Sequence, residues 1–191
     1  MNAWQLLEQD AVAAAQELLG WELVRELPGG GEARVRIVET EAYDQSDAAS
    51  HSFRGKTPRT AVMFGPAGCL YVYFTYGLHY CCNVVVGPEG HGAAVLIRAV
   101  EPVAGEELLA KNRGGKSGAD LTNGPAKLCQ ALDIDRRLNG HRLDQMPLKL
   151  QMKNLIPGEI VVPATRIGIS RDTHRLWRFY IQDNAYVSRA G

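Results

Sequence analysis

Cysteine is scarce in this sequence and long apolar runs are missing, and each shortage excludes a class of protein. The 191 residues include four cysteines, none with C-x-x-C spacing, so neither a zinc site nor a disulfide framework is expected. The most apolar stretch, 67–87, is interrupted by glycine, histidine, asparagine and four tyrosines, which is unlike a membrane span. Residues 1–20 have neither a basic start nor a cleavage site, so a secretory signal is not expected. These absences predict a cytoplasmic protein with no membrane part.

The sequence also lacks an excess of charge of either sign, because 21 basic and 21 acidic residues give a net charge of zero. Acidic residues dominate 1–33, so the remainder has a mild positive bias, which permits a polyanionic partner without requiring one. The G-x-x-x-x-G-K-[ST] pattern of a phosphate loop is absent. Apolar residues make up 46% of a chain of ordinary domain length, which predicts one domain, 1–191, with a substantial core.

Hydrophobic periodicity predicts strands in groups rather than strands alternating with helices. This order favours an α+β fold with a mostly antiparallel sheet. A long polar loop, 44–66, is unusual in a compact domain and therefore suggests function. The expected strands are 21–26, 34–43, 69–75, 79–86, 93–100, 148–152, 166–170 and 177–182, and the expected helices are 3–19, 102–112 and 125–132, the last capped by Asn123.

The strand segment 36–43, RIVETEAY, carries two carboxylates and a large aromatic side chain. Side chains two apart on a strand point the same way, so Glu39, Glu41 and Tyr43 share one face. An acid beside a large aromatic suits a site that activates water next to a stacking pocket. A solvated strand face would show the same pattern, and the spacing alone leaves both interpretations open.

Five aromatic residues crowd the segment 71–80, where two β-rich runs flank Tyr76-Gly77-Leu78. This arrangement predicts a hairpin with Tyr76 at its tip. An exposed tip is a poor place for an aromatic ring unless a partner receives it, and a wedge that enters a base stack would explain it. The alternative is a tyrosine that folds back on the sheet with its hydroxyl in water.

Several other polar residues stand out from their surroundings. Arg98 lies in an apolar strand and needs an anionic partner, either Glu41 or Glu101. Asn83 precedes a valine run and is expected to make a specific hydrogen bond, whereas His51 in the long loop could simply be solvated. Three basic groups are candidate phosphate contacts, although each alone fits a solvated face: Arg54, Lys56 and Arg59; Lys111, Arg113 and Lys116; and Arg171, Arg175 and Arg178.

Seven sequence blocks in order resemble the alkyladenine (3-methyladenine) DNA glycosylase family, and the chain is similar to its bacterial-type members, which lack a long N-terminal extension. The resemblance implies a curved, mostly antiparallel sheet surrounded by helices, with a protruding β-hairpin. The blocks are RIVETEAY at 36–43, TPR at 57–59, MFGPAG at 63–68, LYVYFTYG at 70–77, VLIRAVEP at 95–102, NGPAKLCQAL at 123–132 and RIGIS at 166–170.

The resemblance implies a monofunctional glycosylase of base excision repair. Such an enzyme flips alkylated or deaminated purines (the 3-methyladenine, hypoxanthine and 7-methylguanine class) out of double-stranded DNA, hydrolyses the N-glycosidic bond and leaves an abasic site. No metal ion, cofactor or strand cleavage is expected. A monomer that works in the cytoplasm, associated with a bacterial nucleoid, is expected.

The resemblance also assigns roles to individual residues. Glu41 corresponds to the general base, Arg98 and a main-chain carbonyl near Ile167 to groups that hold the attacking water, and Tyr76 to the wedge. The remaining assignments are Tyr43, His51 and Tyr73 to the walls of the base pocket, Asn83 to its floor, where it screens purines, and Arg54, Arg59 and Lys116 to DNA contacts.

Two features depart from the mammalian pattern of that family. The loop before His51 is one residue shorter, and His79 stands where an aromatic is usual. Two other functions also remain open from the residues alone. One is a non-catalytic module that binds damaged nucleic acid, and the other is a sugar hydrolase that uses Glu39 and Glu41 as paired carboxylates.

Overall fold

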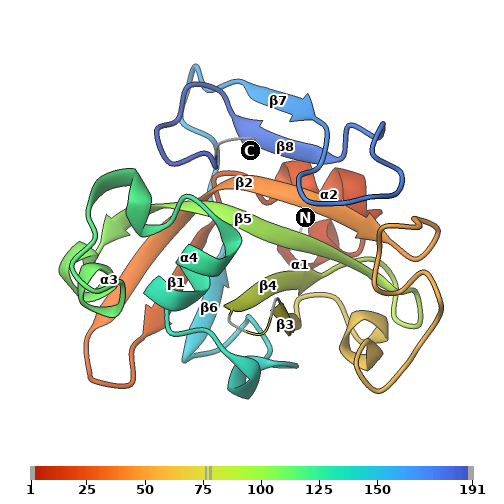
Figure 1. Ribbon diagram of the computed structural model, residues 1–191, viewed down its shortest axis with the longest axis horizontal. Helices are drawn as coiled ribbons and strands as arrows, with labels where there is room; N and C mark the ends of the chain where they lie inside the picture. Colours follow the sequence, from red (N-terminus) through yellow and green to blue (C-terminus); the bar gives the residue numbers. More distant parts are fainter. Residues whose placement is uncertain (1–2, 76, 78, 189–191) are drawn as a thin grey trace.

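The computed structural model describes residues 3–75, 77 and 79–188, and Figure 1 shows their arrangement. The strands form one curved antiparallel sheet with short helices around it, which confirms the predicted α+β class. The strands are β1 Glu22–Glu26, β2 Glu32–Asp44, β3 Leu70–Thr75, β4 His79–Val85, β5 Ala93–Ala104, β6 Leu148–Gln151, β7 Val161–Ala164 and β8 Arg178–Ile181. The α-helices are α1 Ala3–Leu7, α2 Ala11–Glu17, α3 Glu106–Asn112 and α4 Pro125–Ala131, and the 3₁₀ turns are η1 Ala61–Phe64, η2 Gly118–Leu121 and η3 Arg136–Leu138.

The long strand β2 organises the sheet. The order of the main path is β3-β4-β5-β2-β1-β6, and β8 pairs with β2 and with β7. Along one edge β2 pairs with β5, while along the other it pairs first with β1, up to Arg36, and then with β8, from Glu39 to Glu41. The partner therefore changes within a few residues of the two carboxylates.

An irregularity in the β2–β5 ladder lies at this same place. Glu39 pairs with Ala99 and Thr40 pairs with Ile97, so Arg98 on β5 and Val38 on β2 have no opposite residue in the register. Bulges of this kind bend a strand and redirect its side chains. The bulged Arg98 lies beside Glu39 as a result.

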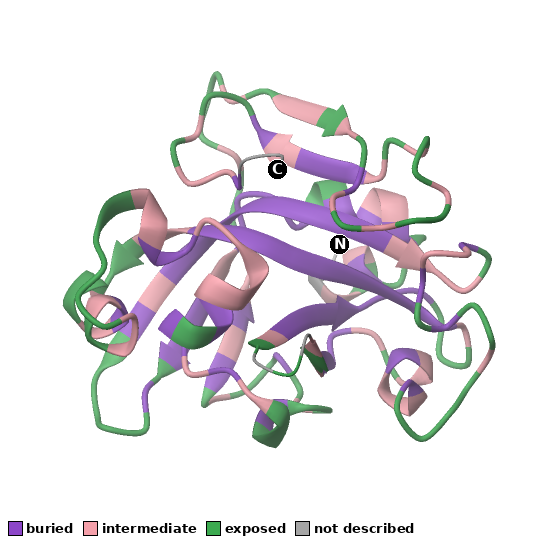
Figure 2. Cartoon of the chain, viewed as in Figure 1, coloured by how far each residue is buried: buried purple, intermediate pink, exposed green. Residues whose placement is uncertain are grey.

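Alternation along β2 separates two faces of the sheet. The Thr40 hydroxyl donates to the Ala15 carbonyl oxygen at 2.8 Å, so this face of β2 packs on α2. Glu39 and Glu41 therefore point to the opposite face. Helix α4 contacts β4 and β5, and Figure 1 shows it on the other side of these strands from α2. Figure 2 shows that β2 and β5 are buried over most of their length.

The β3–β4 hairpin was predicted correctly, with Thr75 opposite His79 at its far end. Burial falls along both strands in that direction, and the Phe74 side chain there is 51% exposed. Tyr76, the predicted wedge, lies outside the described residues. No helix in the described part of the chain is long and apolar enough to cross a membrane.

Two predicted helices were too long. The helix expected over 3–19 is interrupted because Asp10 caps the start of α2, accepting hydrogen bonds from Val12 N–H and Ala13 N–H at 2.9 and 3.0 Å. The helix expected over 102–112 starts only at Glu106, because β5 continues to Ala104. Gly105, with φ of 73°, then makes the turn, and a side chain there would collide with the Glu32 carbonyl oxygen.

Two further predictions were wrong. Residues 166–170 form a loop, and the strand in this region is β7, which lies earlier in the chain. Asn123 does not cap α4, because Gly124 occupies the N-cap position and the Asn123 side chain instead accepts a hydrogen bond from Lys127 Nζ at 2.7 Å. The other expected elements are present, with bounds shifted by one or two residues or, for β5, extended by four.

Candidate active site

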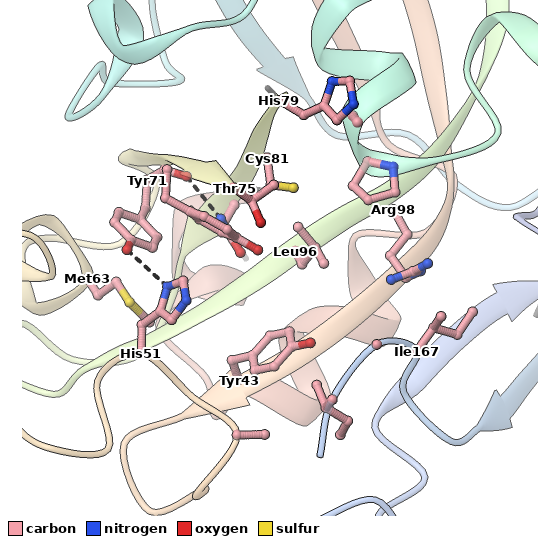
Figure 3. A pocket seen from close by; sticks show the side chains of 17 residues that line it. Tyr43, His51, Met63, Tyr71, Thr75, His79, Cys81, Leu96, Arg98 and Ile167 are labelled. Atoms are coloured by element: carbon pink, nitrogen blue, oxygen red, sulfur yellow. Dashed lines mark hydrogen bonds between the residues drawn. The ribbon is translucent and has the colours of Figure 1, made fainter. Parts of the chain in front are cut away.

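A cavity of about 480 Å³ opens on the face of the sheet that Glu39 and Glu41 point to. Its lining comes from distant parts of the chain: Tyr43 on β2, Tyr73 on β3, Arg98 on β5, His51 in the long loop and Ile167 between β7 and β8. Figure 3 shows Tyr43, His51, Arg98 and Ile167 around one hollow, with Tyr71 of the hairpin on the same side as His51, across from Tyr43. Five residues chosen from the sequence are thus brought together.

Aromatic rings form one wall of the cavity. The His51 and Tyr73 rings meet edge to face, with centroids 4.6 Å apart, and His51 Nδ1 lies 3.1 Å from the Tyr71 hydroxyl (Figure 3). Desolvation lowers the pKa of His51, and the positive charge of Arg59 lowers it further. The imidazole is therefore neutral at neutral pH and can present one donor and one acceptor. Tyr71 was not predicted as a site residue, although it shares a strand face with Tyr73.

Asn83 also lines the cavity, next to this aromatic wall. Its Nδ2 donates to the Tyr71 carbonyl oxygen at 3.0 Å, so the expected specific hydrogen bond is confirmed. Because the hydrogen bond uses the amide nitrogen, the side chain is held in one orientation toward the cavity that it lines. A fixed polar group on an otherwise aromatic surface is suited to discriminating between ligands by their hydrogen-bonding edge.

Glu41 is fully buried directly behind the cavity wall. One carboxylate oxygen accepts a hydrogen bond from Ile167 N–H at 2.7 Å, the other accepts from the Tyr43 hydroxyl at 2.8 Å, and Arg98 Nη1 lies 3.3 Å away. All three partners line the cavity, so the solvated-face interpretation of Glu41 is wrong. The contact observed at Ile167 is made by its amide, whereas the expected water contact involved a carbonyl.

Burial raises the pKa of Glu41, while the positive charge of Arg98 and the hydrogen bond from Ile167 N–H oppose this rise. Desolvation dominates because the carboxylate has lost its water without gaining a bidentate cation. Carboxyl groups with a raised pKa beside a cavity are typical of catalytic acids and bases. Glu41 is therefore a candidate for proton transfer at this cavity.

Glu39 is equally buried, but donors surround it. Arg98 Nε lies 3.3 Å and Arg178 Nη1 2.8 Å from one carboxylate oxygen, and Ser188 binds both oxygens through its amide and hydroxyl. Arg98 therefore lies between Glu39 and Glu41. Glu101, the other expected partner of Arg98, instead binds Arg36. The prediction that Arg178 belongs to a phosphate-binding group is wrong, because its side chain is buried against Glu39.

A second buried ion pair supports the cavity from behind Tyr43. Arg166 binds Asp47 and donates to the Ala42 carbonyl oxygen at 2.9 Å, and neither side chain of the pair has any exposed surface. The Arg166 guanidinium carbon lies 4.8 Å from the centroid of the Tyr43 ring. The pair joins the loop before His51 to the loop that carries Ile167. Sequence analysis did not identify it, since its members are far apart in the chain.

A group of exposed basic side chains, called the rim here, includes one that lies beside an aromatic ring of the cavity. Arg54, Lys56 and Arg59 are exposed, and the Arg59 guanidinium carbon lies 6.0 Å from the centroid of the Tyr73 ring. Lys116 is also exposed and lies 3.8 Å from Asp120. Exposed cations beside a cavity can bind phosphates.

Arg113 differs from the other predicted phosphate contacts. Its guanidinium donates to the carbonyl oxygens of Leu121 and Asp120, each at 3.1 Å, so it supports a loop.

Within the described ranges, no three His, Cys, Asp or Glu side chains lie close enough together to hold a metal ion. Glu41 and Arg98 at this cavity can support acid–base catalysis and electrostatic stabilisation.

Comparison with known proteins points to one family. A family model described as methylpurine-DNA glycosylase matches residues 5–185. A protein of Carboxydothermus hydrogenoformans named "Putative 3-methyladenine DNA glycosylase" is 50% identical over 186 residues, which cover 97% of each chain. Proteins with the same name from Methanoculleus marisnigri and Rhizobium etli are 48% and 44% identical, over 95% of this chain and over 95% and 86% of their own length.

Proposed function

The chain belongs to the methylpurine-DNA glycosylase family, and we propose that it hydrolyses the N-glycosidic bond of alkylated or deaminated purines in duplex DNA. Its enzyme class is that of the DNA-3-methyladenine glycosylases. The product would be an abasic site, the starting point of base excision repair. The observation that carries the proposal is the buried Glu41 carboxylate, held by three residues that line a cavity large enough for one base.

Base extrusion follows from the geometry of the duplex. A glycosidic bond inside stacked DNA is out of reach of a buried carboxylate, so the nucleotide must rotate into the cavity at a cost of a few kcal/mol. A cavity of about 480 Å³ lies in the range of small-molecule sites. The faces of Tyr43 and Tyr73 favour a cationic methylated purine by roughly 0.5–2 kcal/mol each. Tyr76 remains the proposed wedge on the basis of its place in the sequence between β3 and β4.

Glu41 is the proposed general base. Each carboxylate oxygen can accept two hydrogen bonds, so the contacts with Ile167 N–H and the Tyr43 hydroxyl leave capacity for a water molecule. Arg98 favours the ionised form of Glu41 against the effect of burial, and that form can both activate water and stabilise positive charge that develops on the sugar. A purine that alkylation has made cationic leaves as a neutral base, so this class of substrate requires no further catalytic acid.

The surroundings of Glu39 argue against a sugar hydrolase with paired carboxylates. That mechanism needs a second carboxyl group that can reach the substrate, as a proton donor or a nucleophile. Unlike Glu41, Glu39 accepts hydrogen bonds from two arginines and from both the amide and the hydroxyl of Ser188, so its oxygens are occupied by protein donors. The basic rim also has no role in such a hydrolase.

The proposal is tested with duplexes that each carry one modified purine, treated with the protein and then with hot alkali. Alkali breaks the strand only where an abasic site has formed, so cleavage reports base release. Glu41→Gln should bind the lesion duplex and lose base release. Release by this variant at the parent rate would refute the role of Glu41. Tight lesion binding by the parent without any release would instead favour the non-catalytic module.

A further inference from the structure

The last part of the described chain reaches the catalytic corner. Ser188 is 6% exposed, and its amide donates to Glu39 Oε2 at 2.7 Å while its hydroxyl donates to Glu39 Oε1 at 2.9 Å. The two residues are 149 positions apart. The matched family segment ends at residue 185, so this contact lies beyond it. Because the serine binds both oxygens of a buried carboxylate, it fixes the orientation of that carboxylate.

We propose that Ser188 is a positioning residue that holds Arg98 against Glu41, both by fixing Glu39 and through its own contact with Arg98. The inference rests on the proposed function, in which Glu41 is the base. Arg98 is shared between the two carboxylates, with its Nε 3.3 Å from Glu39 and its Nη1 3.3 Å from Glu41. A change in the hydrogen bonds that Glu39 receives from other donors therefore changes how the Arg98 guanidinium is divided between Glu39 and Glu41.

The distribution of donors shows how Ser188 exerts this control. Oε1 of Glu39 accepts from Arg98, Arg178 and the Ser188 hydroxyl, whereas Oε2 accepts from the Ser188 amide. Ser188 Oγ in turn accepts from Arg98 Nη2 at 3.4 Å. Among the described residues, no other donor lies within hydrogen-bond distance of Oε2. Without the serine hydroxyl, Glu39 binds Arg98 more strongly, because a buried carboxylate compensates for each lost donor with those that remain. Glu41 then loses part of its counter-charge.

The segment that carries Ser188 is itself well held. Val187 and Tyr186 pack against the core, the Tyr186 amide donates to Asn184 Oδ1 at 2.9 Å, and Asn184 Nδ2 lies 3.3 Å from Glu101. These contacts fix the backbone independently of the Ser188 side chain. A substitution limited to the hydroxyl therefore tests positioning without releasing the tail.

The experiment compares Ser188→Ala, Ser188→Thr and the control Val187→Ala with the parent. Single-turnover base release is measured across pH on one lesion duplex. Ser188→Ala should shift the acidic limb of the profile to higher pH. A shift of one unit lowers the rate about tenfold at pH values below the midpoint. Lesion binding should be unchanged, Ser188→Thr should restore the parent profile, and Val187→Ala should keep it.

A second readout does not depend on activity. The side-chain carboxyl carbon of Glu41 is followed by NMR in protein labelled at glutamate, with its resonance assigned from Glu41→Gln. Its titration midpoint should rise in Ser188→Ala and return in Ser188→Thr. An unchanged midpoint in folded Ser188→Ala, or an equal rise in Val187→Ala, would overturn the positioning role. Failure of the parent to release a base would refute the proposed function and leave the titration as the test of the Ser188–Glu39–Arg98 linkage.

Discussion

The buried corner behind the cavity and the exposed rim around it are built in opposite ways. In the corner, Glu39, Glu41 and Arg98 contact one another or shared partners, and each is at least nine-tenths buried. On the rim, Arg59 and Lys116 are exposed; Arg59 lies beside the Tyr73 ring, 6.0 Å from its centroid, and Lys116 lies 3.8 Å from Asp120. Side chains in the corner are held by several buried partners, whereas the charged groups on the rim remain accessible to solvent and to phosphates.

The contrast fits the two tasks of a glycosylase. Charge that develops in a transition state is best stabilised by groups already in place, since reorganisation during the reaction would cost free energy. Phosphate binding depends on exposed cations that release counterions and tolerate variable positions. Substitutions in the corner should therefore change rates or folding, and substitutions on the rim should change affinity in a salt-dependent way.

The largest expected effect separates the two corner carboxylates. Glu41→Gln should lower single-turnover base release by about 10²–10⁴-fold, the usual value of a positioned base, with little loss of stability. Glu39→Gln should lower release less and destabilise the fold more, because Arg98 and Arg178 would lose their shared counter-charge. Paired measurements of release and of urea unfolding check this difference. Equal loss of release in two equally stable variants would remove the distinction between base and positioning group.

The next effect concerns the ion pair behind Tyr43. Asp47→Ala leaves Arg166 buried without its partner, which should lower the free energy of unfolding by about 3–5 kcal/mol. Asp144→Ala is the matched control, since that carboxylate pairs with Arg142 at the surface and its loss should cost about 1 kcal/mol at most. Urea unfolding measures both variants. A similar cost in the two would show that the buried pair does not support the cavity wall.

A smaller and graded effect is expected with pH. Because folding raises the pKa of Glu41, the folded state binds this proton more tightly than the unfolded state does. The Glu41 contribution to stability is therefore most favourable below the unfolded pKa and falls as pH rises through the folded pKa. Base release should follow the opposite trend, rising as Glu41 ionises at a pH above the usual glutamate range. Release that stays constant through that range would argue against Glu41 as the titrating base.

The smallest effect is expected on the rim. Arg59→Ala should weaken lesion binding a few-fold and reduce the slope of log affinity against log salt by about 1. The rate of base release from the bound complex should be nearly unchanged. Arg137→Ala is the control, because that arginine is exposed on η3, pairs with Asp135 and does not line the cavity. Binding titrations at several salt concentrations distinguish the variants. Equal salt slopes for parent and Arg59→Ala would show that Arg59 contacts no phosphate.

The sequence was sufficient for the central strand and the direction of its side chains. Alternation in RIVETEAY placed Glu39, Glu41 and Tyr43 on one face, and the apolar surroundings of Arg98 required an acidic partner. Both conclusions depend only on near neighbours in the chain. The predicted single helix over 3–19 was wrong, because the capping preference of Asp10 outweighed the apolar periodicity.

Patterns of neighbouring residues determined which segments are strands, where the hairpin lies and that Glu41 stands beside aromatic rings. Only the tertiary structure decided which charges are partnered. Arg178, predicted to belong to a basic surface group, instead binds Glu39, which is 139 positions away in the chain. Asp47 likewise binds Arg166, which is 119 positions away. Ser188 and Glu39, which are also far apart in the chain, form hydrogen bonds in the folded protein. Local spacing fixes the direction of a side chain on its own element, whereas burial and pairing depend on where the folded chain brings distant elements together.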